Sequence, residues 1–68
     1  MKDAQKMTDT QETRAYGIAR IIVESGAGAD RSARERIVAV APWTVSRWNA
    51  ETFRYCAGWI ELLEFNRK

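Results

Sequence analysis

The sequence contains no histidine and a single cysteine, Cys56, among its 68 residues. One cysteine cannot close an internal disulfide, and zinc sites are built from sets of cysteine and histidine ligands, so we expect no cross-link and no metal. A serine or cysteine nucleophile would also lack the histidine that usually activates it. Glu61 and Glu64 share one side of a predicted helix, but paired surface glutamates are common. We therefore expect a protein that is not an enzyme and needs no cofactor.

Long apolar runs are also missing, and the chain has only one proline, Pro42. No stretch approaches the roughly 20 apolar residues that span a bilayer. The charged start Met1-Lys2-Asp3 lacks the apolar region of a secretory signal. These absences predict a cytoplasmic protein without membrane contact.

The residues that are present are typical of a folded domain, with 46% hydrophobic and 29% charged side chains. A chain of this length forms one domain and hides only about 60% of the surface that its unfolded form exposes. Small domains are often reinforced by disulfides, a metal or a second subunit. Because the first two are not expected here, association of subunits is the remaining reinforcement.

Residues 1–9 are polar and lack periodicity, which predicts a flexible N-terminal tail before a single domain over residues 10–68. Thr8 or Thr10 can cap a first helix, and Ser25-Gly26 can end it. Its buried stripe follows the three-and-four spacing of a helix and consists of Ala15, Ile18, Ala19 and Ile22.

Three further helices are expected after the glycine-rich turn. Asp30 or Ser32 can cap a second helix that runs to about Val40. Pro42 cannot continue that helix but suits the first turn of a new one. A last helix is expected from Thr52 to about Phe65. The pattern therefore predicts an all-α fold, a small bundle of about four helices that contains a helix-turn-helix.

The helix-turn-helix is expected within residues 33–48. Val45 and Trp48 are three residues apart, so we expect both to pack inward, while Trp43, Ser46 and Arg47 turn away. In a DNA-binding helix-turn-helix the start of the second helix enters the major groove. This arrangement predicts that one face anchors the helix and the other reads DNA.

Basic residues gather around this unit, where five arginines, including Arg36, face only Glu35 and Glu51. Arg47 is the main candidate for specificity, because a guanidinium can pair with both acceptors of a guanine. The expected base contacts are Trp43, Thr44, Ser46 and Arg47, and the expected phosphate contacts are Arg31, Arg34, Asn49 and Arg54. Two alternatives stay open: Trp43 can instead pack on Pro42, and the arginines can simply solvate helix surfaces.

The last helix has two apolar stripes, and a helix that is apolar on two sides needs two packing surfaces. The first stripe, expected in the core, holds Phe53, Cys56, Ile60 and Leu63. The second holds Tyr55, Trp59 and Leu62, which we expect to form the interface of a homodimer. The alternative is that a three-helix core covers both stripes.

The segment Thr44-Val45-Ser46-Arg47-Trp48 and the helix ending Ile60-Glu61-Leu62-Leu63-Glu64-Phe65 resemble the CII-type transcriptional activators of lambdoid phages, within the lambda-repressor-like helix-turn-helix group. The resemblance covers residues 13–65. It implies that the helix with Val45 and Trp48 is a recognition helix, and that the protein binds a promoter or operator as a multimer and regulates phage genes.

The chain departs from that family pattern at three places. Glu35 stands where the family favours a small residue, and Ala39 stands where it favours a glycine. These two departures imply a shifted helix pairing or a turn built through Pro42. The chain also stops at Lys68, before the helix that such activators use to form tetramers, so we expect a dimer through the last helix.

The sequence thus predicts a regulator of transcription, phage or prophage encoded, that binds double-stranded DNA sequence-specifically. One alternative is a small helical adaptor or inhibitor that binds another protein through Tyr55, Trp59 and Leu62. A second alternative is an architectural, excisionase-like protein that bends DNA.

Overall fold

The computed structural model describes residues 9–26 and 28–67, and this part of the chain is all-α, without strands. Four helices follow one another in it: α1 (Asp9–Ser25), α2 (Ala33–Val40), α3 (Thr44–Arg47) and α4 (Ala50–Arg67). The predicted small all-α bundle is confirmed. Asp9, expected in the tail, is the first residue of α1, and the rest of that tail lies outside the described residues.

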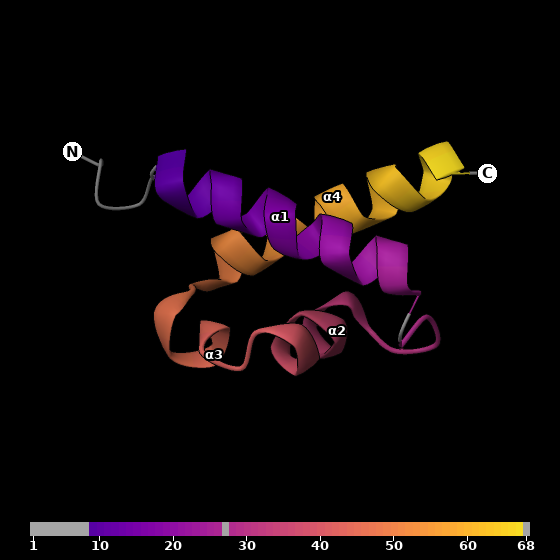
Figure 1. The fold of residues 1–68 in the computed structure, drawn as a ribbon. Helices are drawn as coiled ribbons and strands as arrows, with labels where there is room; N and C mark the ends of the chain where they lie inside the picture. The colour runs from indigo at the N-terminus through magenta and orange to yellow at the C-terminus, as the bar shows by residue number, and fades with distance from the viewer. Residues whose placement is uncertain (1–8, 27, 68) are drawn as a thin grey trace.

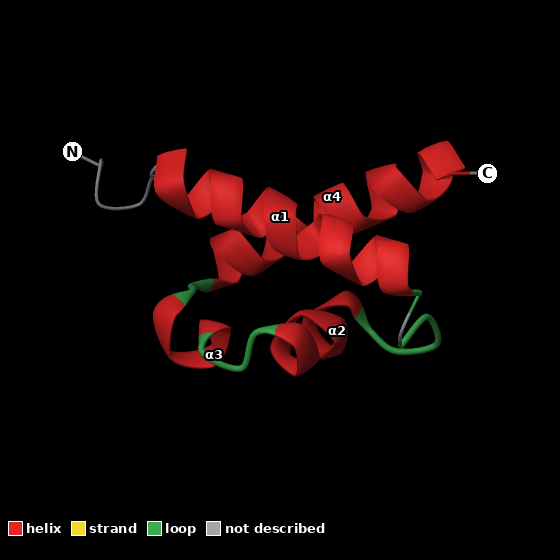
Figure 2. Cartoon of the chain, viewed as in Figure 1, coloured by secondary structure: helices red, strands yellow, loops and turns green. Residues whose placement is uncertain are grey.

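The two long helices α1 and α4 cross each other and form one layer, and the short helices α2 and α3 lie along one side of this pair (Figure 1). Short loops join the helices, and the longest lies between α1 and α2 (Figure 2). Within the described ranges, none of the helices has the length and apolar content needed to cross a membrane.

The core lies where α1 crosses α4. Ala15, Ala19 and Cys56 are completely buried there, and their small size lets the two helices come close. The closeness is visible in one contact, because the Cys56 thiol donates a hydrogen bond to the Ala15 carbonyl at 3.2 Å. Larger buried side chains, Ile22, Ile37 and Ile60, come from α1, α2 and α4. The buried stripe predicted for the first helix is confirmed.

Local capping explains where α1 ends and α2 begins. Gly26 has a positive φ of 71°, which suits glycine, and its N–H bonds to the Ile22 carbonyl at 3.0 Å. Ser32 and Glu35 form a reciprocal capping box, with the Glu35 N–H donating to Ser32 Oγ at 3.2 Å. Glu35, one of the departures from the family pattern, is therefore an exposed capping residue, and Ser32 is confirmed as a cap.

The third helix is shorter and starts later than expected. Pro42 lies in the turn before it, and α3 covers only the four residues Thr44–Arg47. The next helix, α4, begins at Ala50 because Asn49 caps it: the Thr52 N–H and hydroxyl donate to Asn49 Oδ1 at 2.9 and 3.0 Å. The prediction that Thr52 caps this helix was wrong, because the amide oxygen of Asn49, three residues earlier, is the acceptor and Thr52 is the donor.

Candidate nucleic-acid interface

The orientation of α3 is set by two buried residues, Thr44 and Trp48. Thr44 has no exposed surface, and its hydroxyl donates to the Ala41 carbonyl at 2.8 Å. Trp48 is buried just after the helix, and its N–H bonds to the Thr44 carbonyl at 2.9 Å. Together they hold the single turn of α3 against the rest of the fold.

The prediction that Val45 packs inward was wrong, since 55% of Val45 is exposed. The three-residue spacing would place Val45 beside Trp48 only if the helix continued through Trp48. Instead α3 ends at Arg47, and Trp48 has extended backbone angles of φ −100° and ψ 143°. Trp48 therefore reaches the core from outside the helix.

Thr44 cannot serve as the expected base contact, because it is buried and its hydroxyl is used within the turn. A signal for this was present in the sequence. Ala41, Thr44 and Trp48 also follow a three-and-four spacing, and threonine can satisfy its hydroxyl on a carbonyl three residues earlier. The prediction relied instead on the three-residue spacing of Val45 and Trp48 and so chose the wrong register.

Four neighbouring side chains remain outward on this turn: Trp43, Val45, Ser46 and Arg47. Arg47 is exposed and forms no ion pair with another described residue. The Ser46 hydroxyl donates to the Trp43 carbonyl at 3.3 Å, which leaves its oxygen lone pairs available as acceptors. Three of the four are the predicted outward residues, and Val45 is the one that sequence reasoning missed.

Three aromatic rings, those of Trp43, Trp48 and Phe53, form a row that packs between α3 and α4. Trp43 meets Trp48 edge to face with ring centroids 5.8 Å apart, and Trp48 meets Phe53 in the same way at 5.4 Å. Such edge-to-face contacts are a preferred geometry of aromatic pairs. Trp43 is 42% exposed, so it both packs against the fold and presents part of its ring to solvent.

Two guanidinium groups lie at the ends of this aromatic row. Arg34, from α2, places its central guanidinium carbon 4.2 Å from the centroid of the Phe53 ring. Arg14, from α1, lies 6.0 Å from the centroid of a Trp43 ring. Stacking on a ring restrains a guanidinium while leaving its N–H groups free to bond. Arg14 was not predicted, because its place beside Trp43 depends on how α1 packs and not on local spacing.

The other expected phosphate contacts differ in how available they are. Arg31 and Arg54 are exposed, whereas the Asn49 side-chain oxygen is occupied as the cap of α4. Arg36 was counted among the basic residues around the turn, but it is buried and its guanidinium pairs with Glu64 at 3.0 Å. Its charge is therefore paired with a partly exposed carboxylate of α4 and is not part of the basic surface around the turn.

The expected interface residues on α4 fall into two groups. Trp59 packs edge to face against Tyr16 of α1 with centroids 4.6 Å apart, and Tyr55 is half-buried. Leu62 is 48% exposed. Trp59 and Tyr55 thus pack against the core, as the alternative for the second stripe had it, because the crossing of α1 over α4 brings Tyr16 onto Trp59.

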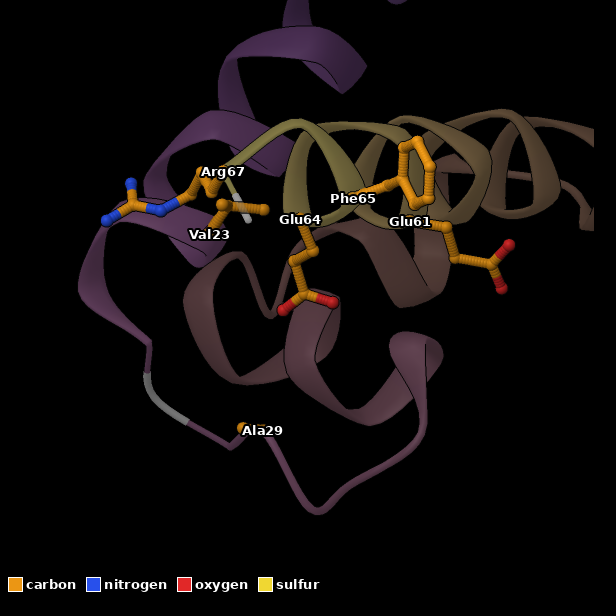
Figure 3. A pocket seen from close by; sticks show the side chains of 6 residues that line it. All are labelled: Val23, Ala29, Glu61, Glu64, Phe65 and Arg67. Carbon is orange, nitrogen blue, oxygen red and sulfur yellow. The ribbon is translucent and has the colours of Figure 1, made fainter.

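An open pocket of about 530 Å³ lies between the end of α4, the end of α1 and the following loop (Figure 3). Glu64 extends from α4 toward α2, whereas Glu61 and Arg67 point in different directions (Figure 3). The ionisable groups of this pocket therefore do not converge on one point. In residues 9–26 and 28–67 no three cysteine, aspartate or glutamate side chains gather as metal ligands.

Cys56 is the only thiol of the chain. Burial raises its pKa to about 11, and its Sγ is held by the Ala15 carbonyl. This environment is that of an inert structural thiol and not of a nucleophile.

Comparison of the chain with protein-family models, with curated protein sequences and with solved structures found no significant match. The resemblance to CII-type regulators therefore stays a prediction from the residues that suggested it.

Proposed function

We propose that this protein binds double-stranded DNA and regulates transcription, with α2, the turn and α3 acting as a helix-turn-helix. The observation that supports the proposal most directly is the outward group on α3: Val45, Ser46 and Arg47 project from one turn that buried Thr44 and Trp48 hold in place. A major groove about 12 Å wide admits a helix presented in this way.

The side chains of this turn match the chemistry of base edges. Arg47 can donate two hydrogen bonds to a guanine, Ser46 can accept or donate one, and Val45 can contact a thymine methyl group. Val45 therefore replaces Thr44 among the proposed base contacts. Because α3 has a single turn, we expect each copy of the protein to read only a few base pairs directly.

The phosphate contacts are assigned to Arg34 and Arg31, which are exposed on and beside α2. Arg34 is restrained by the Phe53 ring, so it loses less side-chain freedom on binding than an unrestrained arginine. Such contacts fix the orientation of the protein on the duplex but read no sequence.

Selection of preferred duplexes from random DNA, followed by titrations at several salt concentrations, tests the proposal. Arg47→Ala is expected to flatten the preference among duplexes, because each base-reading pair contributes about 1–3 kcal/mol of discrimination. Arg34→Ala is expected to weaken binding to all duplexes alike and to lower the salt slope by about 1.

Arg67→Ala is the matched control. Arg67 lies at the C-terminal end of α4, whereas α3 precedes the N-terminal end, so this substitution should leave binding unchanged. Binding that does not weaken as salt rises, or a sequence preference that survives Arg47→Ala intact, would contradict the proposed interface.

A further inference from the structure

The side of α4 opposite its buried residues, its outer face, is exposed along most of the helix. The core face presents Phe53, Cys56 and Ile60, whereas Leu62 and Phe65 on the opposite side are 48% and 73% exposed. A shallow groove of about 360 Å³ follows this outer face and is lined by Arg54, Tyr55, Gly58, Trp59 and Leu62. Leu62 and Phe65 after Gly58 are exposed and Tyr55 before it is half-buried, so this helix face has no partner among the described residues.

Gly58 lies at the centre of this face. A Cβ atom added there would meet no atom within 4 Å, so packing inside the chain does not require a glycine. A glycine in the middle of a helix is unfavourable compared with alanine, but it allows a second backbone to come close. The residue is therefore better explained by contact with another helix than by the fold of one chain.

Charge on the same face is arranged to suit a second copy of α4. Arg54 precedes Gly58 by four residues and Glu61 follows it by three, and neither forms an ion pair with a described residue. A two-fold axis that passes midway between the two Gly58 residues, perpendicular to both helices, makes the two α4 helices antiparallel and keeps each flank of the helix on its own side. Arg54 then stands within one residue, about 1.5 Å along the axis, of Glu61 in the second copy.

The other flank is complementary by the same operation. Tyr55 and Leu62 are also displaced by three and four residues from Gly58, and both lie on the flank opposite to Arg54 and Glu61. The two-fold axis therefore brings Tyr55 of each copy beside Leu62 of the other. A parallel pair would instead give Arg54 no opposite charge at its own height.

We propose that two copies of this chain pair through antiparallel α4 helices that cross at Gly58, with two Arg54–Glu61 ion pairs on one flank and two Tyr55–Leu62 contacts on the other. Trp59 stays in the packing of each copy against Tyr16. Arg54 is thereby assigned to pairing and not to phosphate. The pairing does not depend on DNA binding.

Sedimentation of the full chain without DNA, over a dilution series, tests this pairing. The unmodified chain is expected to be a dimer that dissociates on dilution. Arg54→Glu and Glu61→Arg should each shift the equilibrium to monomer, and the double variant Arg54→Glu/Glu61→Arg should restore the dimer. Circular dichroism should show the same helix content for all of them, because both side chains are exposed.

Gly58→Arg is the second variant, and it should give a folded monomer because the added side chain enters open space in the single chain but blocks the crossing. A chain that is monomeric at every concentration overturns the pairing and leaves the face for a different protein. Failure of the charge exchange to restore the dimer also overturns it. The DNA titrations are a separate measurement, so either proposal can fail while the other holds.

Discussion

At the scale of single residues, short polar side chains decide the local geometry of the proposed reading turn. Thr44, Ser46 and Asn49 all bond to atoms three residues away in the chain. Such local bonds compete with regular helix and favour caps and turns. The sequence shows which residues can form them, but not which of two possible registers is chosen, and for this reason Thr44 and Val45 were exchanged in the prediction.

Cys56 gives a prediction at this scale. Its pKa is raised by burial from about 9.0 to about 11. The folded state therefore keeps its proton between these pH values while the unfolded state loses it, so this contribution to stability is intact below about pH 9 and falls as the pH rises toward 11.

We expect a thiol reagent to modify Cys56 in urea but not in the folded protein at pH 8. We also expect the unfolding midpoint to fall faster above pH 9 in the original sequence than in Cys56→Ala. Rapid modification of the folded chain, followed spectroscopically, would show that the thiol is accessible to the reagent and not buried as described.

At the scale of secondary-structure elements, α1 was predictable and α3 was not. The stripe of α1 repeats over several turns, so Ala15, Ile18 and Ile22 identify its buried face without reference to other helices. The four residues of α3 are too few for any periodicity. Its orientation depends on buried Thr44 and Trp48, and Trp48 in turn packs on the Phe53 ring, which comes from α4.

The start of α4 gives the prediction for this scale. Asn49→Ala removes the acceptor for the Thr52 N–H and hydroxyl, and loss of an N-cap costs about 1 kcal/mol, with a range of about 0.5–2. We expect the upper part of this range, because Thr52 is almost completely buried. Urea unfolding measures the difference.

Asn49→Asp is the matched control, since a carboxylate keeps the acceptor and suits a helix N-terminus. It should retain the stability that Asn49→Ala loses. Equal destabilisation by both substitutions would show that Asn49 does not stabilise the fold by capping α4.

At the scale of the whole molecule, contacts between distant residues hold the layers together, and these were the least predictable. The ion pair of Arg36 with Glu64 joins α2 to α4, and the contact of Tyr16 with Trp59 joins α1 to α4. Nothing in the spacing of Arg36 distinguishes it from the exposed Arg34, so it was grouped with the surface arginines. The helix order and core stripes could be read from the chain, whereas these pairings depend on the crossing angles of the helices.

The Arg36–Glu64 pair gives the prediction for this scale: removing one partner should destabilise the fold more than removing the other. The Arg36 side chain is 5% exposed and that of Glu64 is 41% exposed. Glu64→Ala leaves a cation in a buried site and is expected to cost about 1–2 kcal/mol, discounted for the water that reaches Glu64. Arg36→Met leaves a carboxylate that water can solvate, so it is expected to cost less.

Thermal and urea unfolding of the two variants compare these costs, with Arg20→Met as the control because its pair with Glu24 is exposed at the surface. A greater loss for Arg36→Met than for Glu64→Ala would mean that Arg36 stabilises the fold by packing and not by its charge.

The row formed by Trp43, Trp48 and Phe53 also has an optical consequence. Two indoles in edge contact couple their electronic transitions, and Trp59 contacts a different ring, that of Tyr16. A ligand that displaces Trp43 would change the circular dichroism and fluorescence of the first pair while leaving the second as it was. The chain therefore contains an intrinsic reporter for events at α3, and no dye has to be attached to follow them.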